Sequence, residues 1–189
     1  MVRIGDDQRE LPGESRLEDR VVDSRTVAGG LGSMVLQALY WVKAGWDADR
    51  IVAGLNSMAQ RERMFFLVDT LTYMQKGGRI GGAAALVGNI MQIKPILTIH
   101  DRQVEPYEKI RTKPAAIARV KELVERGCPH RPDAWLSISQ CSAFEEATHL
   151  AADFKQALGF KYIPIYQVPP AIVVNTGPNV LSVSYFAEA

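Results

Sequence analysis

From residue 62 onward the sequence alternates strand-length apolar segments with amphipathic helical patterns, and this alternation restricts the fold more than any other feature. Short apolar runs bounded by glycine, proline or polar residues are typical of buried strands. We expect strands at residues 64–68, 93–99, 104–111, 135–139, 162–168, 171–175 and 180–186. We expect helical segments at residues 69–78, 83–91, 112–127 and 142–159. This pattern predicts a two-layer α/β domain with a mixed sheet of about six strands.

Residues 20–61 carry an incomplete pattern. It predicts a short strand at 20–23, a glycine-containing loop at 24–32, a helix from Ser33 to Gly45 and a second helix capped by Asp47. One strand cannot build a sheet, and two amphipathic helices need a surface to cover. We therefore expect 20–61 to be the remnant of a three-layer α/β domain and 62–189 to be a complete second domain. Residues 1–19 are rich in charge and poor in apolar side chains, which predicts a flexible lead-in.

Charge and composition exclude several classes of partner. The 189 residues contain 22 Lys and Arg against 21 Asp and Glu, for a net charge of +1. Such a balance gives no basic surface for nucleic acid or an anionic membrane, and no apolar run approaches the ~20 residues of a membrane span. The two cysteines, Cys128 and Cys141, are too few for a disulfide framework or a zinc site. They predict free thiols in a reducing compartment, hence a cytoplasmic protein.

The most unusual heptapeptide is Lys76-Gly-Gly-Arg-Ile-Gly-Gly82. Its spacing fits neither a P-loop nor the dinucleotide-binding glycine pattern. One interpretation is a helix end followed by a glycine-rich helix start. The other is a turn that binds an anion or a partner, with Arg79 exposed. The local residues leave both open, as they do for the small-residue segment 83–88, which allows either close packing or room for an apolar ligand.

A second candidate element is the loop that begins at Asn175. Most loops of this composition are only turns. Alternatively, the Asn175 amide, Thr176 and Gly177 could present hydrogen-bond donors to an oxyanion. Arg111, at the end of one expected strand and beside a helix N-terminus, is a further candidate anion contact.

Catalytic and metal-binding patterns are weak. The three histidines, His100, His130 and His149, have no Asp or Ser at a triad spacing, and no carboxylate–histidine group resembles a metal site. We expect no catalytic residue, no metal and no enzymatic activity.

Several segments share an order and spacing that point to one family. They are Val22-Asp-Ser-Arg-Thr26, Gly29-Gly-Leu-Gly32, Phe66-Leu-Val-Asp-Thr-Leu-Thr-Tyr73, Lys76-Gly-Gly-Arg-Ile80, the alanine segment 83–88, Ile93-Lys-Pro-Ile-Leu97, Lys109-Ile-Arg-Thr112 and Asn175-Thr-Gly-Pro178. Together they resemble the DegV family over about residues 20–186, and the block from Phe66 to Thr112 is the most specific part.

The resemblance implies a binding protein for long-chain fatty acids, with no other cofactor. Such proteins are carrier subunits of bacterial fatty acid kinases: they hold the acyl chain in an apolar tunnel and present the carboxylate to a separate kinase subunit. It places Arg79 and Arg111 at the carboxylate end and the kinase-docking face. It also predicts lipid contacts from Asn175, Thr176, Gly177, Ala84, Leu86 and Ile96.

Two departures from the family qualify this expectation. The position of Asn175 is usually histidine, and asparagine can donate a hydrogen bond but does not titrate near neutral pH. The Ser/Thr-rich first domain expected before Arg20 is missing, which predicts weaker binding. The alternatives are an interaction module or remnant without a ligand and, with less support, a phosphotransferase that uses the glycine turn.

Overall fold

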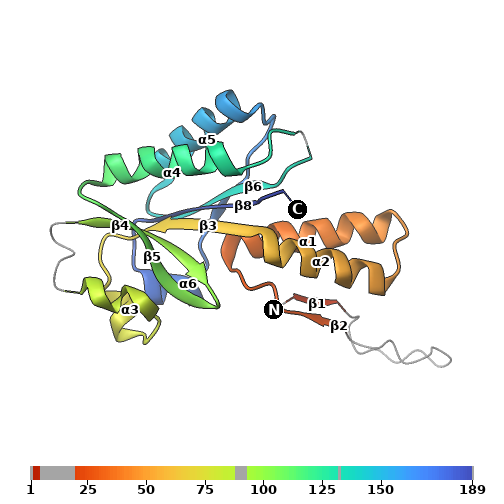
Figure 1. The fold of residues 1–189 in the computed structure, drawn as a ribbon, viewed down its shortest axis with the longest axis horizontal. Coiled ribbons are helices and arrows are strands. Elements are labelled where there is room, and N and C mark those ends of the chain that lie inside the picture. Colours follow the sequence, from red (N-terminus) through yellow and green to blue (C-terminus); the bar gives the residue numbers. More distant parts are fainter. Residues whose placement is uncertain (1, 5–19, 88–92, 132, 189) are drawn as a thin grey trace.

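The computed structural model describes residues 2–4, 20–87, 93–131 and 133–188. Its centre is a six-stranded sheet in the order β5-β4-β3-β8-β6-β7 (Figure 1). The strands are β3 (Glu62–Leu67), β4 (Lys94–His100), β5 (Gln103–Ile110), β6 (Leu136–Cys141), β7 (Ile165–Gln167) and β8 (Val180–Phe186). Neighbouring strands are antiparallel except β6 and β7, which are parallel. The predicted α/β fold with a mixed sheet of about six strands is confirmed.

Two long helices, α4 (Lys113–Gly127) and α5 (Phe144–Leu158), cover one face of the sheet (Figure 1). α4 begins as its sequence predicts, because Thr112 Oγ1 accepts a hydrogen bond from the Ala115 amide and a proline occupies the first turn. The buried stripes of both helices meet inward-facing strand residues such as Ile96 and Ile138 in one core cluster. This apolar layer has the periodicity expected of helices packed on a sheet.

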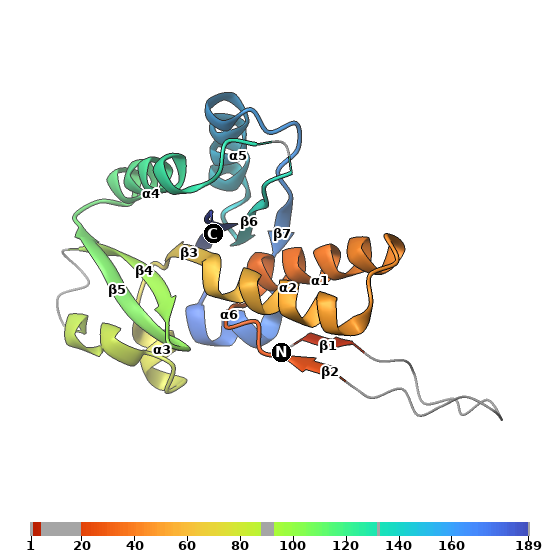
Figure 2. The same cartoon turned by 45° about the vertical axis from the view of Figure 1, so that its right-hand side comes forward.

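The other face carries α1 (Ala28–Lys43) and α2 (Ala48–Arg61) over one part, and α3 (Thr72–Lys76), the 3-10 helix η1 (Gly81–Leu86) and α6 (Pro170–Thr176) over the rest (Figures 1 and 2). Two core clusters lie on this face. One centres on Phe66, Leu71 and Leu86 beneath α3, η1 and α6, and the other on Met34 and Leu55 between α1 and α2.

α1 begins five residues earlier than its sequence predicts. Residues 28–32, expected to lie in a loop, form its first turns. Gly29 lies against the hydroxyl groups of Ser137 and Ser139, so a side chain at position 29 would collide with the sheet. The glycines here allow close helix–sheet contact rather than a flexible loop.

The prediction of a strand at residues 171–175 is wrong. These residues lie in helix α6, which starts at Pro170 and ends at Thr176. Pro169 and Pro170 pre-set the backbone dihedral of a helix start, and Gly177, at φ +76°, ends the helix. Short apolar runs do not distinguish a strand from a buried helix turn.

Two further predicted segments, the helix at 83–91 and the lead-in at 1–19, lie only partly within the described residues. The helix expected at 83–91 is the 3-10 helix Gly81–Leu86, and residues 88–92 lie outside the described part of the chain. Residues 5–19 of the expected lead-in also lie outside the described part of the chain. Residues 2–4 of the lead-in form a strand, β1 (Val2–Ile4), which pairs antiparallel with β2 (Arg20–Val22). The division into a partial domain at 20–61 and a complete domain at 62–189 stays a prediction.

Candidate ligand pocket

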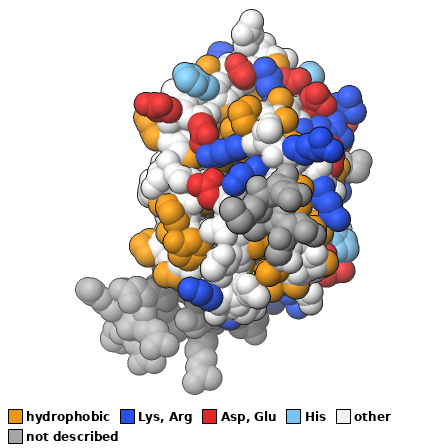
Figure 3. Space-filling model, turned by 90° about the vertical axis from the view of Figure 1, so that its left-hand side faces the viewer, with side chains coloured by type: hydrophobic (Ala, Val, Ile, Leu, Met, Phe, Trp, Pro, Cys, Tyr) orange, Lys and Arg blue, Asp and Glu red, His pale blue; other side chains and the backbone are white. Residues whose placement is uncertain are grey.

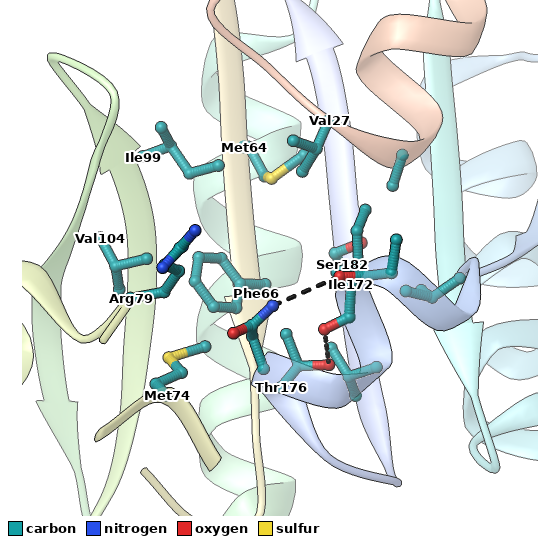
Figure 4. Close-up of a pocket in the computed structure, with 15 residues that line it drawn as sticks. Val27, Met64, Phe66, Met74, Arg79, Ile99, Val104, Ile172, Thr176 and Ser182 are labelled. Atoms are coloured by element: carbon teal, nitrogen blue, oxygen red, sulfur yellow. Dashed lines mark hydrogen bonds between the residues drawn. The ribbon is translucent and has the colours of Figure 1, made fainter. Parts of the chain in front are cut away.

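A cavity of about 200 Å³ lies between the sheet and α6, bounded by the turn after α3 and by the start of α1 (Figure 4). Its walls are mostly aliphatic and aromatic. The lining residues are Val27, Ala28, Met64, Phe66, Met74, Arg79, Ile99, Val104, Val168, Ala171, Ile172, Asn175, Thr176, Val180 and Ser182. An apolar hollow of this kind is suited to a ligand with a long hydrocarbon part.

The floor of the pocket follows from the alternation of side chains along two central strands. Met64 and Phe66 in β3 point to the same face of the sheet, as do Val180 and Ser182 in β8, and Phe66 pairs with Ser182 across the ladder. Ser182 Oγ donates to the carbonyl of Ser139 at 3.3 Å, so its hydroxyl is satisfied within the sheet. The floor is therefore rigid and largely apolar.

Polar groups enter the pocket from α6 and from the turn after α3. Asn175 Nδ2 donates to the carbonyl of Ala171 at 3.3 Å, and Thr176 Oγ1 donates to that of Ile172 at 3.3 Å. Arg79 Nη1 donates to the carbonyl of Gly77 at 3.0 Å, which folds the exposed side chain back toward the pocket (Figure 4). A guanidinium has five N–H donors, so a bond inside the turn leaves most of them to face a ligand.

The structure therefore brings together three of the residues singled out from the sequence, Arg79, Asn175 and Thr176. Gly177 follows them at the end of α6, where the ring of Tyr73 covers it so closely that a Cβ would overlap the ring. Leu86 is buried in the core cluster that supports this side of the sheet.

Three other expected lipid contacts lie elsewhere. Ala84 is exposed on η1, and its neighbour Ala83 is the buried residue. Ile96 is fully buried on the opposite face of the sheet, in the cluster with α4 and α5. Arg111 is exposed just after Ile110, which pairs with Lys94, whereas the pocket lies at the other end of this hairpin, beside Ile99 and Val104.

Sequence reasoning missed most of the pocket lining, including Met64, Phe66 and the start of α1. The signal for the strand residues was present, since alternate positions of β3 and β8 must share a face. The signal for Val27 and Ala28 was not, because only the packing of α1 on the sheet brings them there.

A partly buried carboxyl lies just beyond the pocket. Glu62 precedes Met64 by two residues on the same strand, and its Oε1 accepts a hydrogen bond from Thr26 Oγ1 at 2.9 Å. Burial of this carboxyl raises its pKa to about 7, more than the hydrogen bonds from Thr26 and Ser184 lower it.

Residues 2–4, 20–87, 93–131 and 133–188 contain no metal-binding cluster and no membrane-spanning helix. No group of three or more His, Cys, Asp or Glu side chains in these ranges could hold a metal ion. Across the same residues, no helix has the length and apolarity needed to cross a bilayer. Cys128 and Cys141 are both free thiols.

The sequence profile described as "Uncharacterised protein, DegV family" matches residues 9–188, almost the whole chain. This chain belongs to the DegV family. It is 31% identical over 169 residues to a DegV domain-containing protein of Clostridium acetobutylicum and 33% identical over 171 residues to one of Streptomyces coelicolor. These alignments cover 89% and 90% of this chain but only 59% and 60% of the relatives. The DegV chain described here thus spans about three fifths of their length.

Solved DegV structures have the same fold. The fatty acid binding DegV family protein of Streptococcus agalactiae superimposes with a TM-score of 0.78 at 25% identity, over 90% of this chain and 60% of that one. DegV of Bacillus subtilis, described as a fatty acid binding protein, superimposes with a TM-score of 0.75 at 26% identity, over 88% and 59%. The arrangement of sheet and helices is therefore that of the family.

Proposed function

We propose that this DegV chain binds a long-chain fatty acid, with the acyl chain in the pocket over β3 and β8 and the carboxylate at Arg79 and Asn175. The observation that carries the proposal is the pocket itself, an apolar hollow with a guanidinium and a carboxamide on its wall. Two solved relatives described as fatty acid binding support the same ligand class.

The energetics favour such a ligand. Each methylene transferred from water to an apolar wall contributes about 0.8 kcal/mol, so burying part of an acyl chain offsets the entropic cost of binding. A carboxylate at the wall would accept charge-assisted hydrogen bonds from Arg79, which are about twice as strong as neutral ones. Because Asn175 replaces an ionisable side chain expected from the family, its contribution does not depend on pH.

The proposed role is that of a cytoplasmic bacterial carrier rather than an enzyme. The chain would present the bound carboxylate to a separate fatty acid kinase subunit, which performs the phosphorylation. Arg111 is proposed as part of the docking face for that subunit, because its side chain is exposed and does not line the pocket. Figure 3 shows that Lys and Arg side chains on one face of the molecule are interspersed with Asp and Glu, a surface suited to a protein partner.

The first experiment is mass spectrometry of lipid extracted from the purified chain, followed by titration with a fluorescent fatty acid. Ala171→Trp and Ala84→Trp form a matched pair, since both alanines are exposed on helical turns but only Ala171 lines the pocket. We expect Ala171→Trp to abolish binding and Ala84→Trp to leave the affinity unchanged. Equal affinities in the two variants would contradict the assignment of the pocket.

The carboxylate contact has its own test. Arg79→Gln should weaken binding at least tenfold, because a charge-assisted hydrogen bond contributes about 1.5–3 kcal/mol. Arg126→Gln, at the exposed end of α4, is the control and should bind normally. A folded chain that takes up no fatty acid would instead favour an interaction module without a ligand, for which Arg111→Glu should abolish capture of the kinase subunit.

A further inference from the structure

One edge of the pocket is formed by residues 23–28, which we call the strap; residues 23–27 are irregular, and Ala28 begins α1. The strap connects β2 to α1, and its last two residues, Val27 and Ala28, line the cavity. Figure 4 shows the Val27 side chain next to Met64 at one end of the pocket. The strap is therefore a wall of the ligand site made mostly of irregular backbone, which ends at the first residue of α1.

The strap is fastened at two points. On one side, Asp23 Oδ2 accepts a hydrogen bond from Arg102 Nε in the β4–β5 turn at 2.9 Å and forms an ion pair with its Nη2 at 2.6 Å. On the other side, Thr26 Oγ1 donates to Glu62 at the start of β3. Since Ile99 and Val104 of the β4–β5 hairpin also line the pocket, the Asp23–Arg102 pair joins two pocket walls that are far apart in sequence.

Asp23 divides its two carboxylate oxygens between the turn and the strap. While Oδ2 holds Arg102, Oδ1 accepts the backbone N–H of Arg25 at 3.0 Å. The hydrogen bonds from Arg25 and Arg102 lower the pKa of Asp23, so the carboxylate is fully ionised at neutral pH. Both side chains of the pair are largely solvent-exposed, which makes the contact a reversible one.

Non-glycine residues with positive φ angles lie on both sides of the Asp23–Arg102 pair. In the strap, Arg25 and Ala28 have φ values of 55° and 49°, and in the β4–β5 turn, Asp101 and Arg102 have 46° and 65°. A two-residue hairpin turn of this type usually carries glycine or asparagine, yet here an arginine occupies it and reaches the strap. Non-glycine residues are strained in this region, and such strain clusters at ligand clamps and switches.

We propose that residues 23–28 are a gate of the ligand pocket and that Asp23 and Arg102 form its latch. Opening the latch separates the strap from the β4–β5 hairpin and exposes the cavity between Val27 and Ile99. The acyl ligand then enters and leaves past the strap. This inference rests on the proposed function, since the gate acts on the fatty acid bound in the pocket.

A gate makes a kinetic prediction that a simple wall does not. A latch that closes both the empty and the loaded pocket slows association and dissociation equally and leaves the equilibrium affinity unchanged. An exposed ion pair contributes up to about 1 kcal/mol, so its removal should raise both rate constants by up to about fivefold. Loss of a wall contact would instead raise only the dissociation rate and weaken the affinity.

The experiment is stopped-flow binding and displacement of cis-parinaric acid, a fluorescent fatty acid, on the full chain. Asp23→Asn retains the acceptor for Arg25 but loses the ion pair, and Arg102→Gln removes the other partner. We expect both rate constants to rise by up to about fivefold in each variant, with Kd changed less than twofold. The double variant should be no faster than either single one, because the two residues act through each other. Lys121→Gln breaks the exposed pair with Asp153 between α4 and α5 and is the control.

The variant Arg102→Gly separates the effect of the latch on ligand exchange from an effect on the stability of the fold. Glycine relieves the left-handed position, so this variant should melt at the same or a higher temperature than the wild type while exchanging ligand faster. Unchanged rates in all latch variants, or a weakened Kd with an unchanged association rate, would overturn the gate. A wild-type chain that binds no cis-parinaric acid would overturn the proposed function as well, and that outcome is distinct from a chain that binds but shows no latch effect.

Discussion

The carboxamide oxygen of Asn175 in α6 lies directly against Gly77, in the turn after α3, so closely that a Cβ atom at position 77 would overlap it. The same turn holds Arg79 through the Gly77 carbonyl. One glycine therefore sets the positions of both polar groups proposed to meet the ligand carboxylate. Its role is steric, since its own backbone angles (φ −80°) are open to any residue.

Gly77→Ala should weaken fatty acid binding about tenfold. The added methyl group forces the Asn175 side chain away from the turn and shifts the carbonyl that holds Arg79, and hydrogen bonds to a charged group contribute about 1.5–3 kcal/mol. Isothermal titration with a fatty acid measures the loss. Gly32→Ala is the control, because nothing lies within 4 Å of a Cβ at that position of α1. Wild-type affinity in Gly77→Ala would show that Asn175 and Arg79 do not depend on this contact.

Ile96→Ala should reduce stability without reducing affinity. Ile96 is fully buried on the face covered by α4 and α5, and emptying such a site costs about 2–5 kcal/mol. Ile99→Ala, on the pocket side of the same strand, should weaken fatty acid binding about tenfold, since it removes apolar contact worth roughly 0.8 kcal/mol per methylene. Urea unfolding and ligand titration together separate the two effects. Weaker binding in Ile96→Ala at full folding would place Ile96 back among the ligand contacts.

These two isoleucines show what the sequence can and cannot predict. The strand containing Ile96 is evident from its apolar run, and the mixed sheet follows from the alternation of strands and helices. Which face a residue takes is not evident, because β4 is apolar on both faces, with Ile96 in one core cluster and Leu97 in the other. Alternation along a strand that is buried on both faces does not show which face meets the pocket.

The sequence predicts only those pocket residues whose side chains are distinctive in their local segment. Arg79 and Asn175 stand out because a cation among glycines and a carboxamide at the start of an Asn-Thr-Gly-Pro loop are visible in the sequence itself. Val27 and Ala28 carry no such signal, since aliphatic residues near a glycine cluster are common in loops and in helices alike. Their place in the pocket depends on Gly29 meeting Ser137 and Ser139, residues more than a hundred positions away.

Alkylation should distinguish the two cysteines. Cys128 is buried at the C-terminal end of α4, and this burial raises its pKa to about 12, so almost none of it is thiolate at neutral pH. Cys141 is partly exposed at the end of β6. Iodoacetamide at pH 8 should therefore add one label to the native chain and two to the chain in denaturant, as read by intact mass. Rapid double labelling of the native protein would contradict the burial of Cys128.

Glu62→Gln should stabilise the protein above neutral pH. The pKa of Glu62 is about 7 in the folded chain, against 4.5 for an ordinary glutamate, because burial disfavours its charge. A raised pKa means that the folded state holds the proton more tightly, so this group's contribution to stability is complete below pH 4.5 and declines as the pH rises to 7. Glutamine keeps the acceptor for Thr26 but cannot ionise.

We expect the free energy of unfolding of Glu62→Gln to exceed that of the wild type by about 2 kcal/mol at pH 8, a rise in Tm of about 4–8 °C. This difference should shrink toward pH 5. Thermal unfolding over this pH range measures it, with the exposed Glu145→Gln as the control. A gap that does not change with pH would show that Glu62 ionises normally in the folded protein.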